Sequence, residues 1–503
     1  MKKIRPQGEI FSMTITKERD VFEKASKEEI YNKLVDIFGK NNVTQKPVDL
    51  YPYSYDMTES DPHMPDFVVI PENVYQLVKL VNFANTNKVP IVPYISGNNV
   101  GGLTIPEYGG IIVDFGKKMN KILHINENMM YALLEPGVTF GQLQKYLENN
   151  YPHLRYSYPF APPYAGVVGN AILSGMNNLS CKLGSMGDSI NGIEVITADG
   201  EIARIGSCFY GEKEADLDSW WSRYPMPDLM GLFINWQGMT GLVTKCAVQL
   251  WPNPPITKTF LAIVFGLTDI APVMREIGRT EVVDDISAVS IEVIKMTVNL
   301  PEPIKLPGEP DFAALFPISA KTENLFNAKK EILEKTIEEL RDKGIKVLLV
   351  DVDEFSKLFN LRVRCYLDLP AALLSLVEYS GLTWFGSYAP THKLEELIPK
   401  VNRLFLNYNV PPFIYMKIMK HSHYGIFRPI IRYKKSSEEE KIHKLLTEIT
   451  EVCIDGGCIP YKAPVWMTEK LRKKVNPGWL NLLEKVKKWM DPNNIFNPGR
   501  WNT

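Results

Sequence analysis

The chain has 503 residues, of which 45% are hydrophobic and 23% are charged, which is an ordinary globular composition. This length is sufficient for about two to four domains. The 57 Lys and Arg residues nearly balance the 58 Asp and Glu residues, and the formal net charge is -1. A chain with this balance has no global electrostatic footprint for nucleic acid or for an anionic membrane.

The ends and the cysteines of the chain indicate a soluble, cytoplasmic protein. The N-terminal stretch MKKIRPQGEIFSMTITKERD lacks the apolar segment of a secretory signal, and no window approaches the ~20 apolar residues that span a bilayer. Cys453 and Cys458 stand farther apart than in a redox CxxC motif, and no second pair completes a zinc site. We therefore expect no metal, and reduced packing roles for Cys181, Cys208, Cys246, Cys365, Cys453 and Cys458.

The first half of the chain reads as short strands separated by helices and turns. Apolar residues at helical spacing follow Pro71, from Val74 to Ala84, and predict a helix that has ended by Pro90. The turn pair Asp199-Gly200 between two apolar runs predicts a hairpin. The other expected elements are strands at 66–70, 91–95, 109–114, 132–134, 193–196 and 202–204, and a helix at 142–149.

A break in regular structure is expected at Trp251-Pro-Asn-Pro-Pro255, where three of five residues are proline. Beyond it the pattern predicts strands at 260–265 and 345–351 and helices at 324–343 and 434–453. The tail forms a further helix from Pro477, which the segment 491–499 closes. We therefore predict an α+β fold with two domains that divide near residue 255.

A glycine-rich loop follows the expected strand 91–95. Glycines at 97, 101 and 102 allow positive φ, and consecutive backbone N–H groups can then line one concave surface that holds a phosphate or pyrophosphate. A simple tight turn is the alternative, and the loop is not a Rossmann fingerprint because the GxGxxG order is absent. Three further segments favour the ligand-binding interpretation: 166–171 has small residues suited to backbone that lies against a flat ligand, 135–142 is a strand-to-helix turn, and 238–245 places glycines before a strand.

With these segments in order, the chain resembles the flavoprotein family of vanillyl-alcohol oxidase and p-cresol methylhydroxylase (4-cresol dehydrogenase), from about Asn42 to Arg500. The family has a loop of the form SxGRNxGYG where this chain has Ser96-Gly-Asn-Asn-Val-Gly-Gly102. The other matching blocks are 119–122, 131–139, 168–171, 192–196, 238–245 and the terminal block 491–499.

The resemblance implies an FAD-binding PCMH-type domain of two α/β subdomains at 1–255, a cap (substrate) domain at 256–455, and a C-terminal segment at 456–503 that returns to the FAD domain. It also implies the residues that contact FAD. The pyrophosphate would lie on Ser96, Gly97, Asn98, Asn99, Val100, Gly101 and Gly102, and the flavin or adenosine on Pro136, Gly169, Asn170, Gly241, Leu242 and Val243.

Covalent attachment of the flavin is a separate question. In this family a His or Tyr of the cap domain often bonds the flavin ring, which makes His421, His423 and Tyr424 candidates, with His63 as an assisting residue. Alignment of the following strand places none of the three at the attachment position. His421 and His423 could instead hydrogen-bond in the site or bind a metal, as similar histidines do in the 2-hydroxy-acid branch. We expect noncovalent FAD, with a covalent link as the alternative.

The residues that read the substrate depart from the family pattern. The family's Tyr-Arg pair is Tyr461-Lys462 here, and a cation beside a Tyr hydroxyl would stabilise an anionic phenol oxygen. The phenol-site Tyr falls at Gly102. The segment Ala161-Pro-Pro-Tyr164 has no carboxylate, so Tyr164 is a candidate substitute. Arg428 stands where the 2-hydroxy-acid branch has a metal-binding His, and it could pair with a substrate carboxylate or with the reduced flavin. Surface positions for Lys462 and Arg428 are the alternatives.

The resemblance thus implies an FAD-dependent oxidoreductase that transfers a hydride from a para-substituted phenol or aromatic alcohol to flavin N5. A 2-hydroxy-acid dehydrogenase on the same scaffold is the alternative, and a non-catalytic flavin-binding subunit is a third possibility. The expected partners are a small-molecule substrate, an electron acceptor (oxygen, a cytochrome or another redox protein) and further copies of the chain in a homodimer or larger oligomer.

Overall fold

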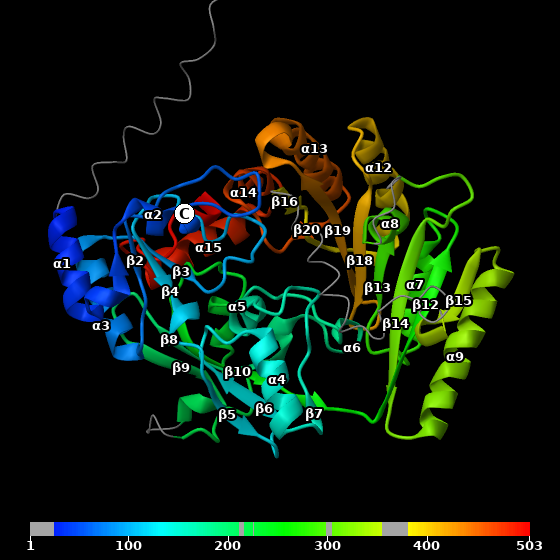
Figure 1. Ribbon diagram of the computed structural model, residues 1–503, viewed down its shortest axis with the longest axis horizontal. Coiled ribbons are helices and arrows are strands. Elements are labelled where there is room, and N and C mark those ends of the chain that lie inside the picture. The colour runs from blue at the N-terminus through cyan, green and yellow to red at the C-terminus, as the bar shows by residue number, and fades with distance from the viewer. Residues whose placement is uncertain (1–24, 211–215, 225, 298–303, 355–380, 503) are drawn as a thin grey trace, which may run out of the picture.

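The computed structural model describes residues 25–210, 216–224, 226–297, 304–354 and 381–502. Within these residues the strands form three larger sheets and one short pair, β7–β11. Two sheets belong to the first half of the chain, and the largest belongs to the second half (Figure 1). Helices occur together with largely antiparallel sheets, so the predicted α+β class is confirmed.

The first sheet has the strand order β1-β2-β4-β3. Strands β2, β4 and β3 run parallel, and β1 is antiparallel to β2. Helix α3 begins after Asn73, whose side chain accepts a hydrogen bond from the backbone N–H of Gln76, and it ends at Asn87, before Pro90 as predicted. The bounds are α1 Lys27–Phe38, β1 Val43–Thr44, α2 Pro47–Leu50, β2 Phe67–Val69, α3 Val74–Asn87, β3 Ile91–Tyr94 and β4 Ile111–Asp114.

The second sheet is antiparallel, with the order β5-β6-β10-β8-β9. The predicted hairpin is confirmed in β8 and β9, because Ile196 pairs with Ile202 and the turn between them contains Gly200 at a φ of 79°. The bounds are β5 Ile122–Asn126, β6 Tyr131–Leu134, α4 Phe140–Asn150, β7 Leu154–Arg155, α5 Val167–Ile172, α6 Ser180–Leu183, β8 Ile190–Ile196, β9 Ile202–Gly206 and β10 Leu242–Gln249.

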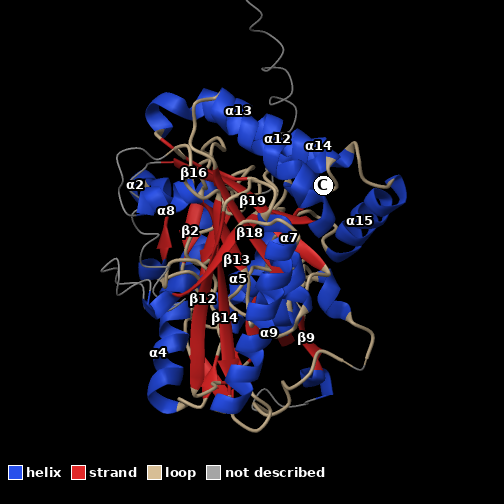
Figure 2. Cartoon of the chain, turned by 90° about the vertical axis from the view of Figure 1, so that its right-hand side faces the viewer, coloured by secondary structure: helices blue, strands red, loops and turns tan. Residues whose placement is uncertain are grey.

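The largest sheet follows the order β15-β12-β14-β13-β18-β19-β17-β20, with β16 also paired to β19. Figure 2 shows α7 and α9 in front of its long strands. The bounds are β12 Ile256–Val264, α7 Ile270–Arg279, β13 Ser287–Ser290, α8 Ile291–Thr297, β14 Phe312–Ala320, α9 Glu323–Asp342, β15 Val347–Asp351, β16 Gly381–Trp384, β17 Ser387–Ala389, α12 Leu394–Asn407, β18 Phe413–Met419, β19 Tyr424–Tyr433, α13 Lys435–Asp455 and β20 Ile459–Pro460.

Alternation along β19 decides which of its side chains can reach a ligand. Phe427 and Ile431 pack with the helices α7, α9, α12 and α13 in one core. Ile426 and Ile430 belong to a different cluster on the opposite face. Because side chains on a strand alternate between its faces, Arg428 shares the face of Ile426 and Ile430, away from those helices.

The expected break at Trp251–Pro255 is only partly correct. Trp251 and Pro252 form the two-residue strand β11, which pairs with Arg155 and Leu154 of β7. Proline is tolerated there because the pair has no further strand on the other side of β11. The next strand, β12, begins at Ile256, four residues earlier than predicted. The division of the chain into domains near residue 255 stays a prediction.

The C-terminal segment returns to the first sheet. Helices α14 Val465–Arg472 and α15 Pro477–Met490 precede it. Ile91 of β3 donates its N–H to the carbonyl of Ile495 at 2.7 Å and accepts from Asn497 at 2.9 Å. The red C-terminal ribbon accordingly lies beside the blue strands in Figure 1. The chain's last residues therefore brace the strand from which the glycine-rich loop departs.

Two other sequence-based expectations bear on the described residues. Cys181, Cys208, Cys246, Cys453 and Cys458 are buried and unpaired, as predicted, and Cys365 lies outside the described residues. None of the helices in the described ranges has the length and apolar character needed to cross a membrane.

Candidate active site

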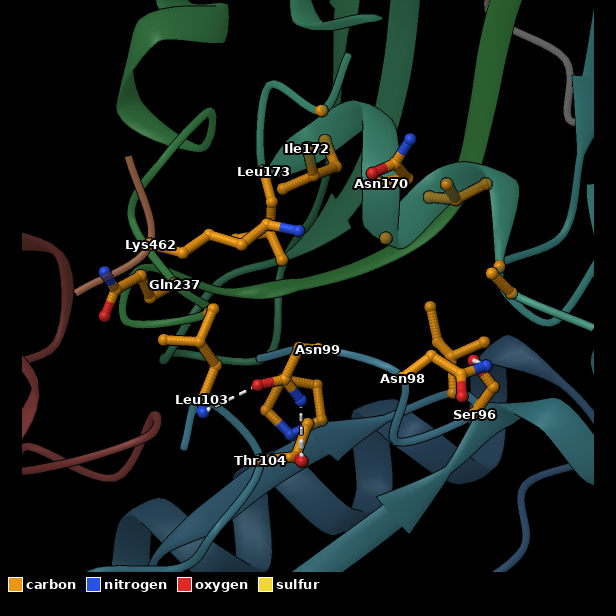
Figure 3. A pocket seen from close by; sticks show the side chains of 18 of the residues that line it. Ser96, Asn98, Asn99, Leu103, Thr104, Asn170, Ile172, Leu173, Gln237 and Lys462 are labelled. Atoms are coloured by element: carbon orange, nitrogen blue, oxygen red, sulfur yellow. Dashed lines mark hydrogen bonds between the residues drawn. The ribbon is translucent and has the colours of Figure 1, made fainter. Parts of the chain in front are cut away.

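A cavity lies where the glycine-rich loop, α5, the start of β10 and the largest sheet meet. About 240 Å³ of it is open to the centres of water molecules. Figure 3 shows the loop residues Ser96, Asn98 and Asn99 on one side, and Asn170, Ile172 and Leu173 of the α5 region on the other. The cavity is therefore built by segments from both halves of the chain.

The loop after β3 presents its backbone rather than its side chains. Gly97 has a φ of 64°, and a Cβ atom at this position would collide with the Tyr94 hydroxyl. The N–H groups of residues 97–101 donate to no acceptor within the described part of the chain. Because backbone N–H groups require acceptors, this run of free donors is suited to an anionic ligand.

Side chains hold the loop in this conformation. Asn99 accepts a hydrogen bond from the N–H of Leu103 at 2.9 Å and donates to Thr104 Oγ1 at 3.0 Å, as drawn in Figure 3. Gly102 donates its N–H to Asp56 Oδ2 at 2.9 Å, and its carbonyl accepts from Arg500 Nη2 at 2.7 Å. The loop is thus fixed from both ends of the chain before any ligand binds.

The opposite side of the cavity contains glycines that lie in close contact with Pro93 of β3 and with Ile95, which follows β3. A Cβ atom on Gly166 would lie 2.7 Å from Ile95 Cγ2, and one on Gly238 would lie 2.8 Å from Pro93 Cγ. Gly169 and Gly241 also line the cavity. No side chain larger than hydrogen fits at Gly166 or Gly238 without displacement of these neighbours, so backbone forms this part of the wall.

These features fit FAD. The free N–H groups of residues 97–101 suit its pyrophosphate, and the glycine-lined wall leaves room for its flat rings. Gln237 Oε1, on the same cavity, is buried without a hydrogen-bond partner in the described structure. An unpartnered buried amide oxygen is costly unless a ligand or water supplies a donor.

Arg428 and Tyr461 meet on the side of the cavity formed by the largest sheet. Arg428 Nη2 donates to the Tyr461 hydroxyl oxygen, and the guanidinium lies 4.7 Å from the centre of the Trp384 ring. Arg428 Nε is buried and has no partner among the described residues. Since the Tyr461 oxygen already accepts from Arg428, its own hydrogen is free to be donated into the cavity.

Lys462 enters the cavity from the C-terminal segment. Figure 3 shows its side chain extended toward Leu173, across the space between the glycine-rich loop and α5. Its Nζ lies 6.0 Å from the centre of the Tyr461 ring, and a Cβ atom on Gly101 would contact its backbone carbonyl at 3.6 Å. Burial, together with the nearby positive charge of Arg428, lowers the pKa of Lys462 to about 8.

The cavity is electropositive and walled by aromatic rings. Of the described residues that line it, Arg428, Tyr461 and Lys462 carry titratable side chains, and none of the others is acidic. Burial raises the pKa of Tyr461 above its usual value, although Arg428 opposes the shift. Phe160 and Trp384 supply apolar walls beside these groups. This arrangement suits an aromatic or apolar ligand with one anionic oxygen.

Most predicted site residues line this cavity, and some do not. Those that line it are Tyr461, Lys462, Arg428, Ser96, Gly97, Asn98, Asn99, Pro136, Gly169, Asn170, Gly241 and Val243. Val100, Gly101, Gly102 and Leu242 are buried behind the lining. Tyr164 is not on the lining, and 48% of its surface is exposed.

The histidines and Tyr424 also lie outside the lining. His63 Nδ1 is 3.4 Å from Glu107 Oε2. His421 and His423 lie in the turn between β18 and β19, where His421 donates its N–H to the carbonyl of Cys181. Tyr424 packs edge-on against Tyr388, with ring centres 5.4 Å apart.

Sequence reasoning missed several lining residues. Phe160, Met176, Gln237, Trp384 and Asn497 all line the cavity. Asn497 lies inside the terminal block that supported the resemblance, so its place in that block was a usable signal. The others stand in no motif, and the fold alone brings them to the site.

Comparisons with known proteins agree with this geometry. Residues 65–206 match the FAD binding domain family, and residues 278–501 match the C-terminal domain of FAD linked oxidases. The chain is 27% identical to glycolate oxidase subunit GlcD of Bacillus subtilis (strain 168), with 94% of this chain and 96% of the relative covered. It is 26% identical to the flavoprotein subunit of 4-cresol dehydrogenase [hydroxylating] of Pseudomonas putida, with 93% and 95% covered.

The fold also matches a solved structure. The crystal structure of p-cresol methylhydroxylase with substrate bound superposes with a TM-score of 0.82 at 21% identity, and the match covers 94% of this chain and 96% of the other. At this identity the similarity demonstrates a shared fold.

Proposed function

Because the chain belongs to the vanillyl-alcohol oxidase and p-cresol methylhydroxylase family and is an FAD-dependent oxidoreductase, we propose that it oxidises a para-substituted phenol or aromatic alcohol. Tyr461, Lys462 and Arg428 hold the substrate's oxygen as an anion. Bound FAD accepts the hydride that the substrate loses. The chain's own contribution is to bind, orient and ionise the substrate.

One observation carries this proposal: Tyr461, Arg428 and Lys462 line one aromatic-walled cavity that has no carboxylate among its described lining residues. The Tyr461 hydroxyl and Lys462 Nζ are donors without an acceptor among the described residues, and Arg428 holds the Tyr461 oxygen by a hydrogen bond. Donors that are fixed before binding stabilise a developing negative charge more effectively than water does, because they need no reorganisation. A phenol oxygen that meets them is stabilised in its ionised form.

The apolar walls define the rest of the substrate. Trp384 already stacks its ring on the Arg428 guanidinium, and Phe160 stacks on Tyr415 with ring centres 6.0 Å apart and an interplanar angle of 11°. These contacts hold the rings of the wall in place. An aromatic ring of the substrate would meet walls that are already ordered, which reduces the entropy lost on binding.

A 2-hydroxy acid is the second candidate substrate, and two observations favour it. Arg428 and Lys462 together could pair with a carboxylate, since the described lining offers them no acidic partner. The relative from Bacillus subtilis is named a glycolate oxidase subunit. The aromatic walls beside the two cations make the phenol the better fit.

We further propose that FAD is held noncovalently and mainly by residues of the first half of the chain. Neither His421, His423 nor Tyr424 lines the cavity, which supports the absence of a covalent link from those candidates. The hydrogen bonds of Asn497 and Arg500 to the glycine-rich loop region support the proposal that segment 456–503 returns to an FAD-binding domain at 1–255.

The test is an anaerobic titration of the flavin-loaded protein, followed by flavin absorbance. We expect 4-ethylphenol and vanillyl alcohol to bleach the flavin, and Tyr461→Phe to slow the bleaching at least about tenfold. The matched control is Tyr146→Phe, which removes a hydroxyl on the outer side of α4. Bleaching by glycolate or D-lactate alone would favour the second candidate, and bleaching by neither series would refute both.

A further inference from the structure

We propose that Lys462 is the proton acceptor of this site: the hydroxyl proton of a bound phenol moves to Lys462 Nζ. The inference rests on the proposed function and assigns to Lys462 a step that goes beyond charge stabilisation. In this step the substrate O–H bond breaks, an N–H bond forms at Nζ, and a phenolate–ammonium ion pair replaces a neutral phenol and a neutral amine. No oxidant or co-reactant is needed.

Among the described side chains that line the cavity, Lys462 is the one suited to accept the proton. Arg428 offers N–H donors and no acceptor atom. The Tyr461 oxygen accepts a hydrogen bond from Arg428, and burial raises the pKa of its hydroxyl, so Tyr461 acts as a donor. The described residues that line the cavity include no Asp, Glu or His. Lys462 Nζ, by contrast, has a lone pair whenever the amine is neutral.

The surroundings of Lys462 make the neutral amine accessible at a lower pH than for an ordinary lysine. Arg428 and Tyr461 are the titratable groups that face it, since the loop 96–104 and the helix α5 contribute none from their sides of the cavity. Its Nζ donates no hydrogen bond to any described residue. Burial and the adjacent guanidinium bring the pKa of Lys462 to about 8, within reach of neutral pH. An arginine at this position could not act in this way, because it does not deprotonate.

The phenolate formed by proton transfer offsets the electrostatic cost of a charged Lys462 beside Arg428. A protonated Lys462 beside Arg428 places two positive charges in one partly buried cavity. A phenolate between them offsets this repulsion, so the proton is most stable on Nζ once the anion is present. The site therefore favours ligands that bring their own acidic proton.

This role makes a prediction that distinguishes phenols from carboxylates. A carboxylate arrives already ionised, and it binds most tightly below about pH 8, where Lys462 carries its charge. A phenol brings the proton that Lys462 needs, so its affinity changes little between about pH 8 and the pKa of the free phenol. Below pH 8, binding of the phenolate instead expels a proton into the solvent.

The experiment measures how many protons are released when a phenol binds. Binding of 4-bromophenol, which has no oxidisable alkyl carbon, to the flavin-loaded protein is measured by calorimetry at each pH in two buffers of different ionisation enthalpy, phosphate and imidazole at the lower pH and borate and CHES at the higher. The difference in heat between the two buffers gives the protons released. We expect about one proton per site at pH 6.5 and fewer than about 0.3 at pH 9, with a midpoint near the pKa of Lys462.

Two variants of Lys462 and one control complete the test. Lys462→Arg should release about one proton at both pH values, and Lys462→Met should show no dependence of the release on pH. Lys485→Met, on the exposed side of α15, should behave as the wild type. The flavin absorbance spectrum verifies that each variant is folded and loaded.

The outcomes separate this inference from the proposed function. Proton release that is independent of pH in the wild type, or a pH step that persists in Lys462→Met, would overturn the role of Lys462 and leave the phenol site intact. If 4-bromophenol does not bind at all, the proposed phenol site is itself refuted, and the inference fails with it.

Discussion

Arg428 donates a hydrogen bond to the hydroxyl of Tyr461, although the two residues are 33 positions apart in the sequence. Arg428 belongs to β19, and Tyr461 follows β20 directly. Both strands pair with β17, on its opposite edges. The sheet therefore sets the distance between the two side chains and holds the Tyr461 hydroxyl on a rigid support beside the cavity.

Replacement of Arg428 by lysine should impair oxidation of a phenol much more than it impairs folding. Lysine keeps the charge but loses the planar set of donors that reaches Tyr461 and the cavity at once. We expect kcat/KM to fall about 100-fold, which corresponds to about 2.7 kcal/mol of transition-state stabilisation. Stopped-flow reduction of the flavin measures this. An unchanged rate would show that Arg428 does not contact the substrate.

Gly97→Ala should weaken FAD binding. An alanine at this position would have to keep the backbone φ of 64°, and its methyl group would collide with the Tyr94 hydroxyl. The loop that presents the free N–H groups therefore has to shift. We expect the affinity of the deflavoprotein for FAD to fall at least about tenfold, as measured by quenching of FAD fluorescence.

Gly344→Ala is the matched control for Gly97→Ala. Gly344 has a φ of 89°, but nothing lies within 4 Å of the added Cβ atom. This variant should lose about 1 kcal/mol of folding free energy through backbone strain alone and keep its FAD affinity. Equal FAD affinities in the two variants would contradict the role of the loop at 97–101.

Asn497→Ala should loosen the cofactor site from the C-terminal side. Asn497 is buried, and its Nδ2 donates to the carbonyls of Gln237 at 2.7 Å and Leu103 at 3.2 Å. Loss of these donors leaves two buried carbonyls without a hydrogen bond. We expect the free energy of unfolding and the free energy of FAD binding each to weaken by about 1–3 kcal/mol, as measured by thermal unfolding and by FAD titration. Asn493→Ala, in the same segment, removes an exposed bond to Asn85 and should cost less than about 0.5 kcal/mol.

Acid precipitation should release the flavin into the supernatant. His421, His423 and Tyr424 lie outside the lining of the cavity, so we expect no covalent bond from them to FAD. His421→Ala and His423→Ala should retain the same amount of yellow cofactor as the wild type. A flavin that stays with the precipitated protein, and that is lost in one of these variants, would identify the attachment residue.

Lys462→Met should stabilise the flavin-loaded protein at neutral pH. The pKa of Lys462 is lowered to about 8 in the folded protein, while the unfolded chain keeps the ordinary value near 10.5. The unfolded state thus binds more protons between these values, and the stability of the wild type rises with pH across this window. We expect the variant to exceed the wild type by about 3 kcal/mol at pH 7 in chemical denaturation, and the difference to shrink toward pH 10.

Local patterns in the sequence were sufficient for much of the fold. The hairpin around Asp199-Gly200, the helix that starts after Asn73 and the helix from Pro477 were all predicted, because caps, turn residues and apolar spacing act over a few residues. The strand β11 at Trp251–Pro252 was not predicted, because its stability comes from a partner about a hundred residues away, at 154–155.

The sequence by itself determined that the chain is an FAD-binding protein through the resemblance of several motif blocks in order, of which the glycine-rich loop after β3, with positive φ at Gly97, Gly101 and Gly102, is one. Only the tertiary structure decided which side chains share the cavity. Trp384, Arg428, Tyr461 and Lys462 stand in no common motif, and strand pairing brings them together. The perturbed pKa of Lys462 likewise arises from burial and from Arg428, and both depend on how distant segments pack rather than on the residue type.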